Sequence, residues 1–223
     1  MSGVWQVLRR LKIHYKRGRR VVHSPDPDYD AKLTIIRTFI EQARAQPKRI
    51  VVVYHDELTY YRKPSVGRSY ALAGSKGPLA RQGWGYNYTR RIAASLNVVT
   101  GRLFSWQRAK FDRFTLIRYF KALEAAYPDA ERIWVILDNW PVHFHPDVLA
   151  ALRDSKVKLM PLPTYAPWTN PTEKVWLKLH ADVLHLHTLA DDWDQLQRVV
   201  DTWLNRYANE STDLLRFVGL CID

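Results

Sequence analysis

The sequence has a single cysteine among its 223 residues, Cys221, close to the C-terminus. One cysteine excludes an intrachain disulfide framework and a cysteine-rich metal site. No apolar run approaches the roughly 20 residues that a membrane-spanning helix needs, and the N-terminus is too basic and too interrupted for a signal peptide. These absences predict a soluble intracellular protein without a membrane partner.

Acidic residues are scarce as well. The excess of 34 Lys and Arg over 22 Asp and Glu gives a net charge of +12 and a pI near 9.9. Two segments contain no acidic residue at all: residues 1–24, with seven Lys and Arg, and residues 58–111, with ten. This charge distribution predicts a polyanionic partner, and nucleic acid fits it better than a membrane surface.

The first acid-free segment is expected to form an arm ahead of the main domain. Residues 4–15 place apolar side chains at helical spacing, which predicts a short amphipathic helix. The run KRGRR follows, and we expect Arg17, Arg19 and Arg20 to lie along DNA phosphates or in a minor groove; a solvated charge run is the alternative. A turn-rich hinge and a helix come next. The predicted division is a basic arm (1–24), a linker helix (25–47) and a main domain (48–223).

The second acid-free segment interleaves its basic residues with Tyr and Trp. This composition is typical of a groove that follows a nucleic-acid backbone and stacks bases on aromatic rings; aromatic side chains of a core are the alternative. We expect DNA contacts from Arg62, Lys63, Arg90 and Arg91. The glycines at 74 and 77 lack the spacing of a phosphate-cradling Walker loop, so no nucleotide cofactor is expected.

Apolar runs and amphipathic stretches alternate along residues 48–223. Strands are predicted from residue 50 and at 91–98, 102–108, 133–137 and 157–160, with helices at 112–127, 146–153 and 172–186 and over the C-terminal portion. The order predicts a ribonuclease H-like α/β fold: three antiparallel strands followed by two parallel βα units, with helices on both faces. In this fold the first strand lies beside, and parallel to, the strand 133–137.

Three acidic residues stand where this fold would bring them together. Asp56 lies toward the end of the first strand, and Asp138 follows the strand 133–137; neighbouring strands are about 4.8 Å apart. Glu173 lies in the first turn of the helix 172–186. Each has a local alternative, because Asp138 can start a turn and Glu173 can complete a capping box with Asn170 as N-cap. Together, the carboxylates supply oxygen ligands for two Mg²⁺ ions roughly 3.5–4 Å apart, as phosphodiester cleavage requires.

Three motifs carry a resemblance to a known family: VVVYHDE around Asp56, LDNWPVHFHP around Asp138, and LPTYAPWTNPTEKVW around Glu173, with 34 residues between the last two acids. The sequence resembles the catalytic part of bacterial insertion-sequence transposases of the Tc/mariner superfamily, with a DDE superfamily endonuclease domain. The resemblance implies a DNA transposase with two Mg²⁺ ions, or Mn²⁺ as substitute, held by Asp56, Asp138 and Glu173. It also implies cleavage at the terminal repeats of an element and strand transfer into target DNA, commonly at a TA step, by a homodimer.

The resemblance leaves other functions open. Relatives carry a paired helix-turn-helix region before the hinge, of which only one short helix is expected here. A catalytically inactive DNA-binding remnant is therefore the alternative function, and a ribonuclease or resolvase on the same scaffold is a third. In each case we expect a cytoplasmic protein at the bacterial nucleoid.

Further residues are expected around the three acids. Asn139, His143 and Asn170 are expected to surround the metal ligands, with His143 orienting Asp138 or touching phosphate. Lys174 and Lys178 are expected to contact DNA phosphates; solvated lysines are the alternative. The histidine pairs at 143 and 145 and at 185 and 187 raise zinc as a weaker alternative, because no cysteine accompanies them.

Overall fold

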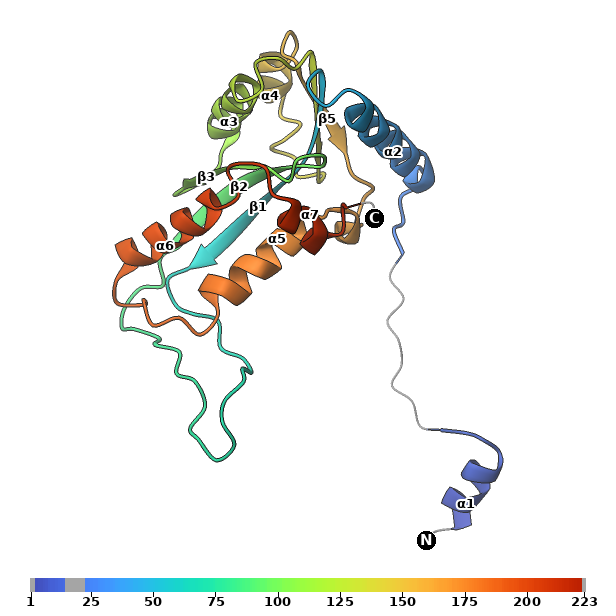
Figure 1. The fold of residues 1–223 in the computed structure, drawn as a ribbon, viewed down its shortest axis with the longest axis vertical. Helices are drawn as coiled ribbons and strands as arrows, with labels where there is room; N and C mark the ends of the chain where they lie inside the picture. The colour runs from blue at the N-terminus through green and yellow to red at the C-terminus, as the bar shows by residue number, and fades with distance from the viewer. Residues whose placement is uncertain (1–2, 15–22, 222–223) are drawn as a thin grey trace.

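The computed structural model describes residues 3–14 and 23–221. Its central element is a five-stranded sheet with the order β3-β2-β1-β4-β5 (Figure 1). The strands are β1 (Ile50–Tyr61), β2 (Thr89–Asn97), β3 (Leu103–Arg108), β4 (Arg132–Leu137) and β5 (Val157–Pro161). β1 to β3 pair antiparallel, whereas β4 pairs parallel with β1 and with β5. The predicted ribonuclease H-like α/β layout is confirmed.

Helices cover both faces of the sheet. They are α2 (Tyr29–Ala45), α3 (Arg113–Ala125), α4 (Pro146–Ala151), α5 (Thr172–Leu179), α6 (Trp193–Asn205) and α7 (Thr212–Val218). One core cluster joins α3 and α4 to one face, and a second joins α5, α6 and α7 to the other (Figure 1). The chain therefore has the helix–sheet–helix layering that its alternating pattern predicts.

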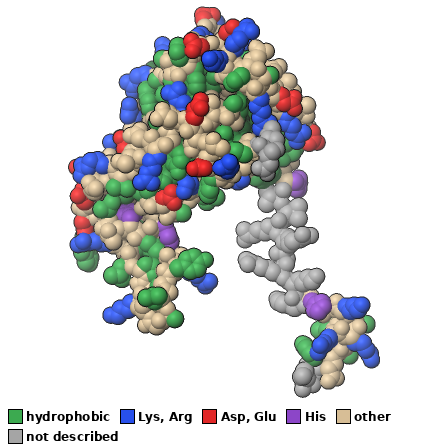
Figure 2. Space-filling view, in the orientation of Figure 1, with side chains coloured by type: hydrophobic (Ala, Val, Ile, Leu, Met, Phe, Trp, Pro, Cys, Tyr) green, Lys and Arg blue, Asp and Glu red, His purple; other side chains and the backbone are tan. Residues whose placement is uncertain are grey.

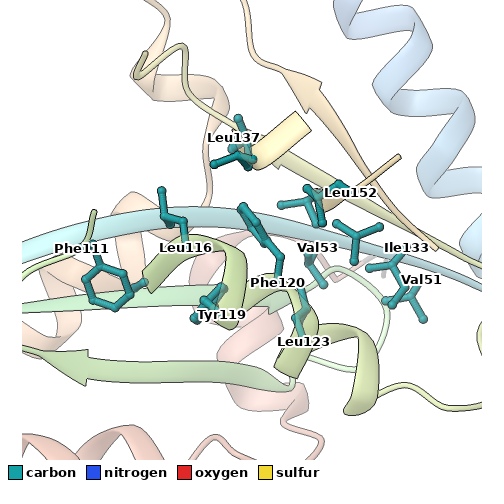
Figure 3. Close-up of a cluster of buried hydrophobic side chains, with 14 of the residues drawn as sticks. Val51, Val53, Phe111, Leu116, Tyr119, Phe120, Leu123, Ile133, Leu137 and Leu152 are labelled. Carbon is teal, nitrogen blue, oxygen red and sulfur yellow. The ribbon is translucent and has the colours of Figure 1, made fainter. Parts of the chain in front are cut away.

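The alternation of side chains along β1 decides which face each functional residue occupies. Val51 and Val53 pack into the cluster beneath α3 (Figure 3). Val52 packs with α2, and Tyr60 packs with α5 and α6. Because successive strand residues point to opposite faces, Asp56 falls on the α5 face and its two neighbours fall on the α3 face.

Two element boundaries differ from the sequence prediction. β1 continues to Tyr61, well past its apolar run, because its second half remains paired with β2. The helix predicted at 172–186 is α-helical only to Leu179, and His180–Leu184 form a π-helical turn. The apolar pattern alone could not locate the end of the α-helix, because the side-chain spacing of an α-helix and of a short π turn differs by less than one residue per turn.

The N-terminal helix α1 (Gly3–Arg10) has no buried residue. The three arginines expected to contact DNA in the basic arm, Arg17, Arg19 and Arg20, lie outside the described residues. Within the described part of the chain, no helix combines the length and apolar character needed to cross a membrane.

The chain between β1 and β2 forms a long loop, residues 62–88, which projects from the body of the domain (Figure 1, Figure 2). Its large apolar side chains are exposed: Val66, Tyr70, Leu72, Leu79, Trp84, Tyr86 and Tyr88. Tyr60, by contrast, is 1% exposed in the core. Some aromatic residues of the acid-free segment therefore belong to the core, and others are exposed, as a base-stacking groove would require.

Candidate active site

Asp56, Asp138 and Glu173 line one cavity of about 460 Å³. The last paired residues of the parallel β1–β4 ladder are Tyr54 and Ile136. Asp56 and Asp138 each lie two residues further along their strands, at equivalent positions beyond the end of the ladder. Glu173 reaches the same cavity from the first turn of α5. The three acids that the sequence singled out thus come together from three separate elements.

Asp56 is held by neutral donors. The indole Nε1 of Trp176 donates to Oδ2 at 2.9 Å, and the backbone N–H of Glu57 donates to Oδ1 at 2.9 Å. Burial raises the pKa of Asp56 to about 7, and the negative charges of Glu173 and Glu57 add to this rise. A divalent cation beside Asp56 would oppose both effects and favour the ionised carboxylate.

Glu173 does not form the capping box that was its local alternative. The backbone N–H of Asn170 donates to Pro167 O at 2.9 Å, and the Asn170 Oδ1 accepts from Thr172 N at 3.1 Å. Among the hydrogen bonds of the described residues, none involves the Glu173 carboxylate, which faces the cavity instead. Burial and the charge of Asp138 raise the pKa of Glu173.

Asp138 is held by a cation. Its Oδ1 accepts from Trp140 N at 3.0 Å and lies 3.2 Å from His143 Nδ1. The other ring nitrogen of His143 lies 3.0 Å from Glu57 Oε1. Burial alone would lower the pKa of His143, but the hydrogen bonds to Asp138 and Glu57 and their charges raise it to about 10. His143 is thus a buried imidazolium between two carboxylates, and its hydrogen bond lowers the pKa of Asp138.

The polar chain continues through the α3 face of the sheet. Glu57 Oε1 also lies 3.0 Å from His55 Nε2, and His55 Nδ1 lies 3.0 Å from Ser95 Oγ. Ser95 Oγ lies 2.9 Å from the hydroxyl of Tyr119, which donates to Phe104 O. Burial would raise the pKa of Glu57, yet the two histidines lower it. The site therefore rests on a buried hydrogen-bond network beneath Asp138.

The structure offers two sets of donors that suit metals of different kinds. Ligand atoms of His55, Glu57 and His143 lie within 4.8 Å of one another, a His₂Glu combination that zinc favours. The Nε2 atoms of His55 and His143, however, both lie 3.0 Å from the same oxygen, Glu57 Oε1, and the strongly basic His143 opposes metal ligation. The cavity instead presents three carboxylates, the hard oxygen ligands of Mg²⁺ and Mn²⁺.

The histidine pairs proposed from sequence as a zinc site are separated by their contacts. His145 Nδ1 accepts from Asp147 N at 3.2 Å at the start of α4, while His143 faces Glu57. His185 Nδ1 lies 3.3 Å from Ser65 Oγ, and His187 Nδ1 accepts from Leu189 N at 3.1 Å. The structure does not support zinc at these pairs.

The asparagines expected around the acids both brace the loop that forms one wall of the cavity. Asn139 Nδ2 donates to Leu162 O at 2.8 Å, and Asn170 Nδ2 donates to His55 O at 3.3 Å. Both residues also line the cavity.

The expected DNA-contacting cations are in several environments. Arg62 is only 8% exposed and donates to Trp84 O at 2.6 Å, so it anchors the projecting loop, in contrast to the expected exposed cation. Lys174 donates to Val218 O at 2.8 Å, and Lys178 pairs with Asp182 at 2.9 Å. Lys63, Arg90 and Arg91 are half-buried. The pattern of charges along the sequence does not reveal such local contacts. The sequence therefore predicted the same DNA-contacting role for all of these cations.

Sequence reasoning missed three contributors to the site. Glu57 and His55 stand within the motif around Asp56, and Trp176 within the motif around Glu173, but none of them was predicted from the sequence to have a role in the site. Trp176 is buried in the core, at 4% exposure, and its indole reaches Asp56. The available signal was strand alternation, because residues 55 and 57 of a buried strand must share one face and a His–Glu pair there requires a polar partner.

Comparisons with known proteins agree with this geometry. A family model described as DDE superfamily endonuclease matches residues 51–197. The chain is 26% identical over 188 residues to the insertion element IS630 uncharacterized 39 kDa protein of Shigella sonnei, covering 84% of this chain and 53% of that protein. The chain therefore spans about half the length of this curated relative.

Solved structures with a similar fold include a pre-cleavage Mos1 transpososome. The TM-score is 0.65 at 16% identity, and the match covers 97% of this chain and 66% of that chain. The catalytic domain of Mos1 mariner transposase matches with a TM-score of 0.54 at 14% identity, covering 90% of this chain and 91% of that chain. At these identities the similarity establishes a shared fold.

Proposed function

Because the chain belongs to the DDE superfamily endonucleases, we propose that it is the catalytic part of an insertion-sequence transposase that cleaves DNA and transfers the freed strand to a target. The observation that carries this proposal is the meeting of Asp56, Asp138 and Glu173 in one cavity. Support also comes from the similarity to an insertion-element protein and to the structures of a Mos1 transposase paired-end complex and a Mos1 strand transfer complex.

The three acids are the proposed ligands of two Mg²⁺ ions, with Mn²⁺ as substitute. Mos1 paired-end complexes have been solved with each of these metals. Bound in pairs, such ions activate the attacking oxygen of a phosphodiester reaction and stabilise the leaving oxygen. Asp56 and Asp138 would hold the ions from adjacent strands, and Glu173 would complete the set from α5.

The remaining residues near the cavity have positioning roles in this proposal. His143, held by Glu57, fixes the rotamer of Asp138 and keeps it ionised. The indole of Trp176 holds one carboxylate oxygen of Asp56, and the backbone N–H of Glu57 holds the other. Asn139 and Asn170 fix the loop beside the acids, so Asp56, Asp138 and the loop are each held by a separate set of contacts.

DNA is the proposed partner, as terminal repeats and as a target that includes TA sites. The acid-free segment supplies positive charge, and Arg91 of β2 lies directly opposite Arg108 of β3. Like charges at opposing strand positions destabilise a sheet, and a bound polyanion would relieve this repulsion. Two element ends require two active sites, which supports a homodimer on DNA, with the basic arm 1–24 and the linker 25–47 ahead of the catalytic domain 48–223.

The test is Mn²⁺-supported nicking of a supercoiled plasmid by the purified chain. Asp138→Ala and Glu173→Gln are each expected to abolish nicking, while DNA binding in a filter or mobility-shift assay changes little because a carboxylate, itself an anion, does not neutralise a phosphate. Nicking that survives either substitution would overturn the metal assignment. Salt-sensitive DNA binding by a wild-type chain that never nicks would favour the inactive DNA-binding remnant instead.

A further inference from the structure

The cavity around the three acids has two chemically different sides. One side carries the carboxylates, and the other is formed by residues of the loop that joins β5 to α5. The loop residues that line the cavity are Leu162, Pro163, Thr164, Tyr165, Ala166 and Pro167. A phosphodiester whose phosphate lies at the carboxylates must place an adjoining sugar and base elsewhere, and the loop offers an apolar surface for them.

Tyr165 stands out within this loop because its backbone is in the left-handed region, with φ of 53°. A bulky side chain rarely adopts this conformation, which glycine adopts without strain. The side chain nevertheless gains no burial from it, since Tyr165 is 78% exposed while its neighbour Ala166 is 4% exposed. Packing of the protein therefore does not account for an aromatic residue at this position.

The residues on either side of Tyr165 are fixed by hydrogen bonds. The N–H of Thr164 donates to Asp26 Oδ2 at 2.8 Å, and its carbonyl accepts from the hydroxyl of Ser24. The carbonyl of Ala166 accepts from Thr169 N at 3.0 Å and from Thr169 Oγ1 at 2.6 Å. The loop thus presents the Tyr165 ring from a braced, preorganised backbone rather than from a free segment.

Trp140 is the other aromatic residue that lines the cavity. Its ring packs edge-on against His143, with centroids 5.2 Å apart, and its backbone N–H donates to Asp138. These contacts commit Trp140 to the support of Asp138. Tyr165 has the more exposed ring, and it lies on the apolar side of the cavity.

We propose that Tyr165 stacks on the nucleobase next to the scissile phosphate and so positions that phosphate at the carboxylates. The proposal deepens the function above and rests on it. Stacking on an aromatic ring tolerates any base, because every base has a π-face, which suits an enzyme that cuts and joins different DNA sequences. The strained backbone would then serve to hold the ring outward into the path of the DNA.

A double-mutant cycle between protein and DNA tests this contact. The strongest nick made by the wild-type chain in a supercoiled plasmid with Mn²⁺ is mapped, and short duplexes centred on it are prepared intact or with an abasic site at each nucleotide flanking the cut. Nicking of these duplexes is measured for wild type, Tyr165→Gly and Tyr165→Phe. Phe114→Ala is the matched control, because Phe114 is also an exposed aromatic residue, at 56%, and does not line the cavity.

Removing the ring or removing the base is expected to lower kcat/KM about tenfold each. The combination is expected to be no worse than either change alone, since both remove the same contact. Tyr165→Phe should retain the wild-type response to the abasic site, and Phe114→Ala should leave nicking unchanged. Tyr165→Gly should unfold at the wild-type temperature or above it, because glycine relieves the strained φ.

Three results would overturn the inference. Losses that multiply to about a hundredfold would show that ring and base act independently. A lower unfolding temperature for Tyr165→Gly would show a packing role instead. If the wild-type chain does not nick DNA, the proposed function fails together with the stacking contact. If it nicks DNA and the two losses multiply, only the stacking contact fails.

Discussion

Asp56 and Asp138 have the same functional group at matching positions of two neighbouring strands, yet their surroundings are opposite. Burial and negative neighbours raise the pKa of Asp56, whereas the bond from His143 lowers the pKa of Asp138. The difference follows from the side chains that bond to them, because Asp56 meets the neutral indole of Trp176. Asp138 faces the buried cation that Glu57 stabilises. Near neutral pH, Asp56 therefore depends more than Asp138 on a nearby divalent cation to be ionised.

The indole bond to Asp56 can be separated from ordinary packing by a matched pair of substitutions. Trp176 donates to Asp56 Oδ2 at 2.9 Å, and Trp203 donates to Asp182 Oδ2 at 2.9 Å, away from the cavity. Trp176→Phe and Trp203→Phe should each lower the free energy of unfolding by about 2 kcal/mol, because each removes an indole N–H that donates to a carboxylate. Urea unfolding measures this loss.

Only Trp176→Phe should impair Mn²⁺-supported nicking, by about tenfold or more, because it frees the Asp56 carboxylate to rotate. Equal effects of the two substitutions on nicking would show that Trp176 acts through stability alone.

At the scale of elements, the linker before α2 and the loop before α5 form one unit. Asp26 accepts from Thr164 N at 2.8 Å, and the Trp168 indole donates to the Tyr29 hydroxyl at 3.2 Å. Asp26 also pairs with Lys32 at 2.7 Å, with only 3% of its side chain exposed. These contacts attach the start of the linker to the wall of the cavity, so the position of the wall depends on a segment more than a hundred residues earlier in the chain.

The Asp26 contacts should make this unit sensitive to acid. The hydrogen bond from Lys32 and that from the Thr164 backbone hold the pKa of Asp26 well below its ordinary value of 3.8. A lowered folded-state pKa contributes stability above the unfolded-state pKa, and this contribution is lost as the pH falls through the folded-state value. Asp26→Asn should therefore lower the unfolding temperature at pH 5 to 7, and the difference from wild type should shrink below about pH 4.

Thermal unfolding from pH 7 to pH 3 measures this dependence. Asp30→Asn is the control, since Asp30 is an exposed acid in the first turn of α2. A constant difference between wild type and Asp26→Asn over the whole pH range would contradict the ion-pair explanation.

At the scale of the whole molecule, much of the architecture follows from local patterns. The apolar runs at the two central strands and the hairpin between them predict the sheet, and the position of Asp138 after its strand predicts the edge at which it meets Asp56. The buried network of Glu57 and His143 could not be derived in the same way, because it joins residues 86 positions apart on a face that only the completed sheet defines. The shape of the loop 62–88 also escaped prediction, since it buries few of its apolar side chains and thus lacks the periodicity of a packed element.

The positive charge of the molecule leads to a prediction about individual cations. A cation that neutralises a DNA phosphate contributes about one unit to the slope of log K against log salt, whereas a cation already paired with a carboxylate contributes little. Arg91 stands opposite Arg108 in the sheet, while Lys178 is paired with Asp182. Arg91→Gln should reduce the slope for duplex DNA by about one unit, and Lys178→Gln should leave it nearly unchanged. Mobility-shift titrations at several salt concentrations measure both slopes, and an equal reduction would show that DNA displaces Asp182 from Lys178 on binding.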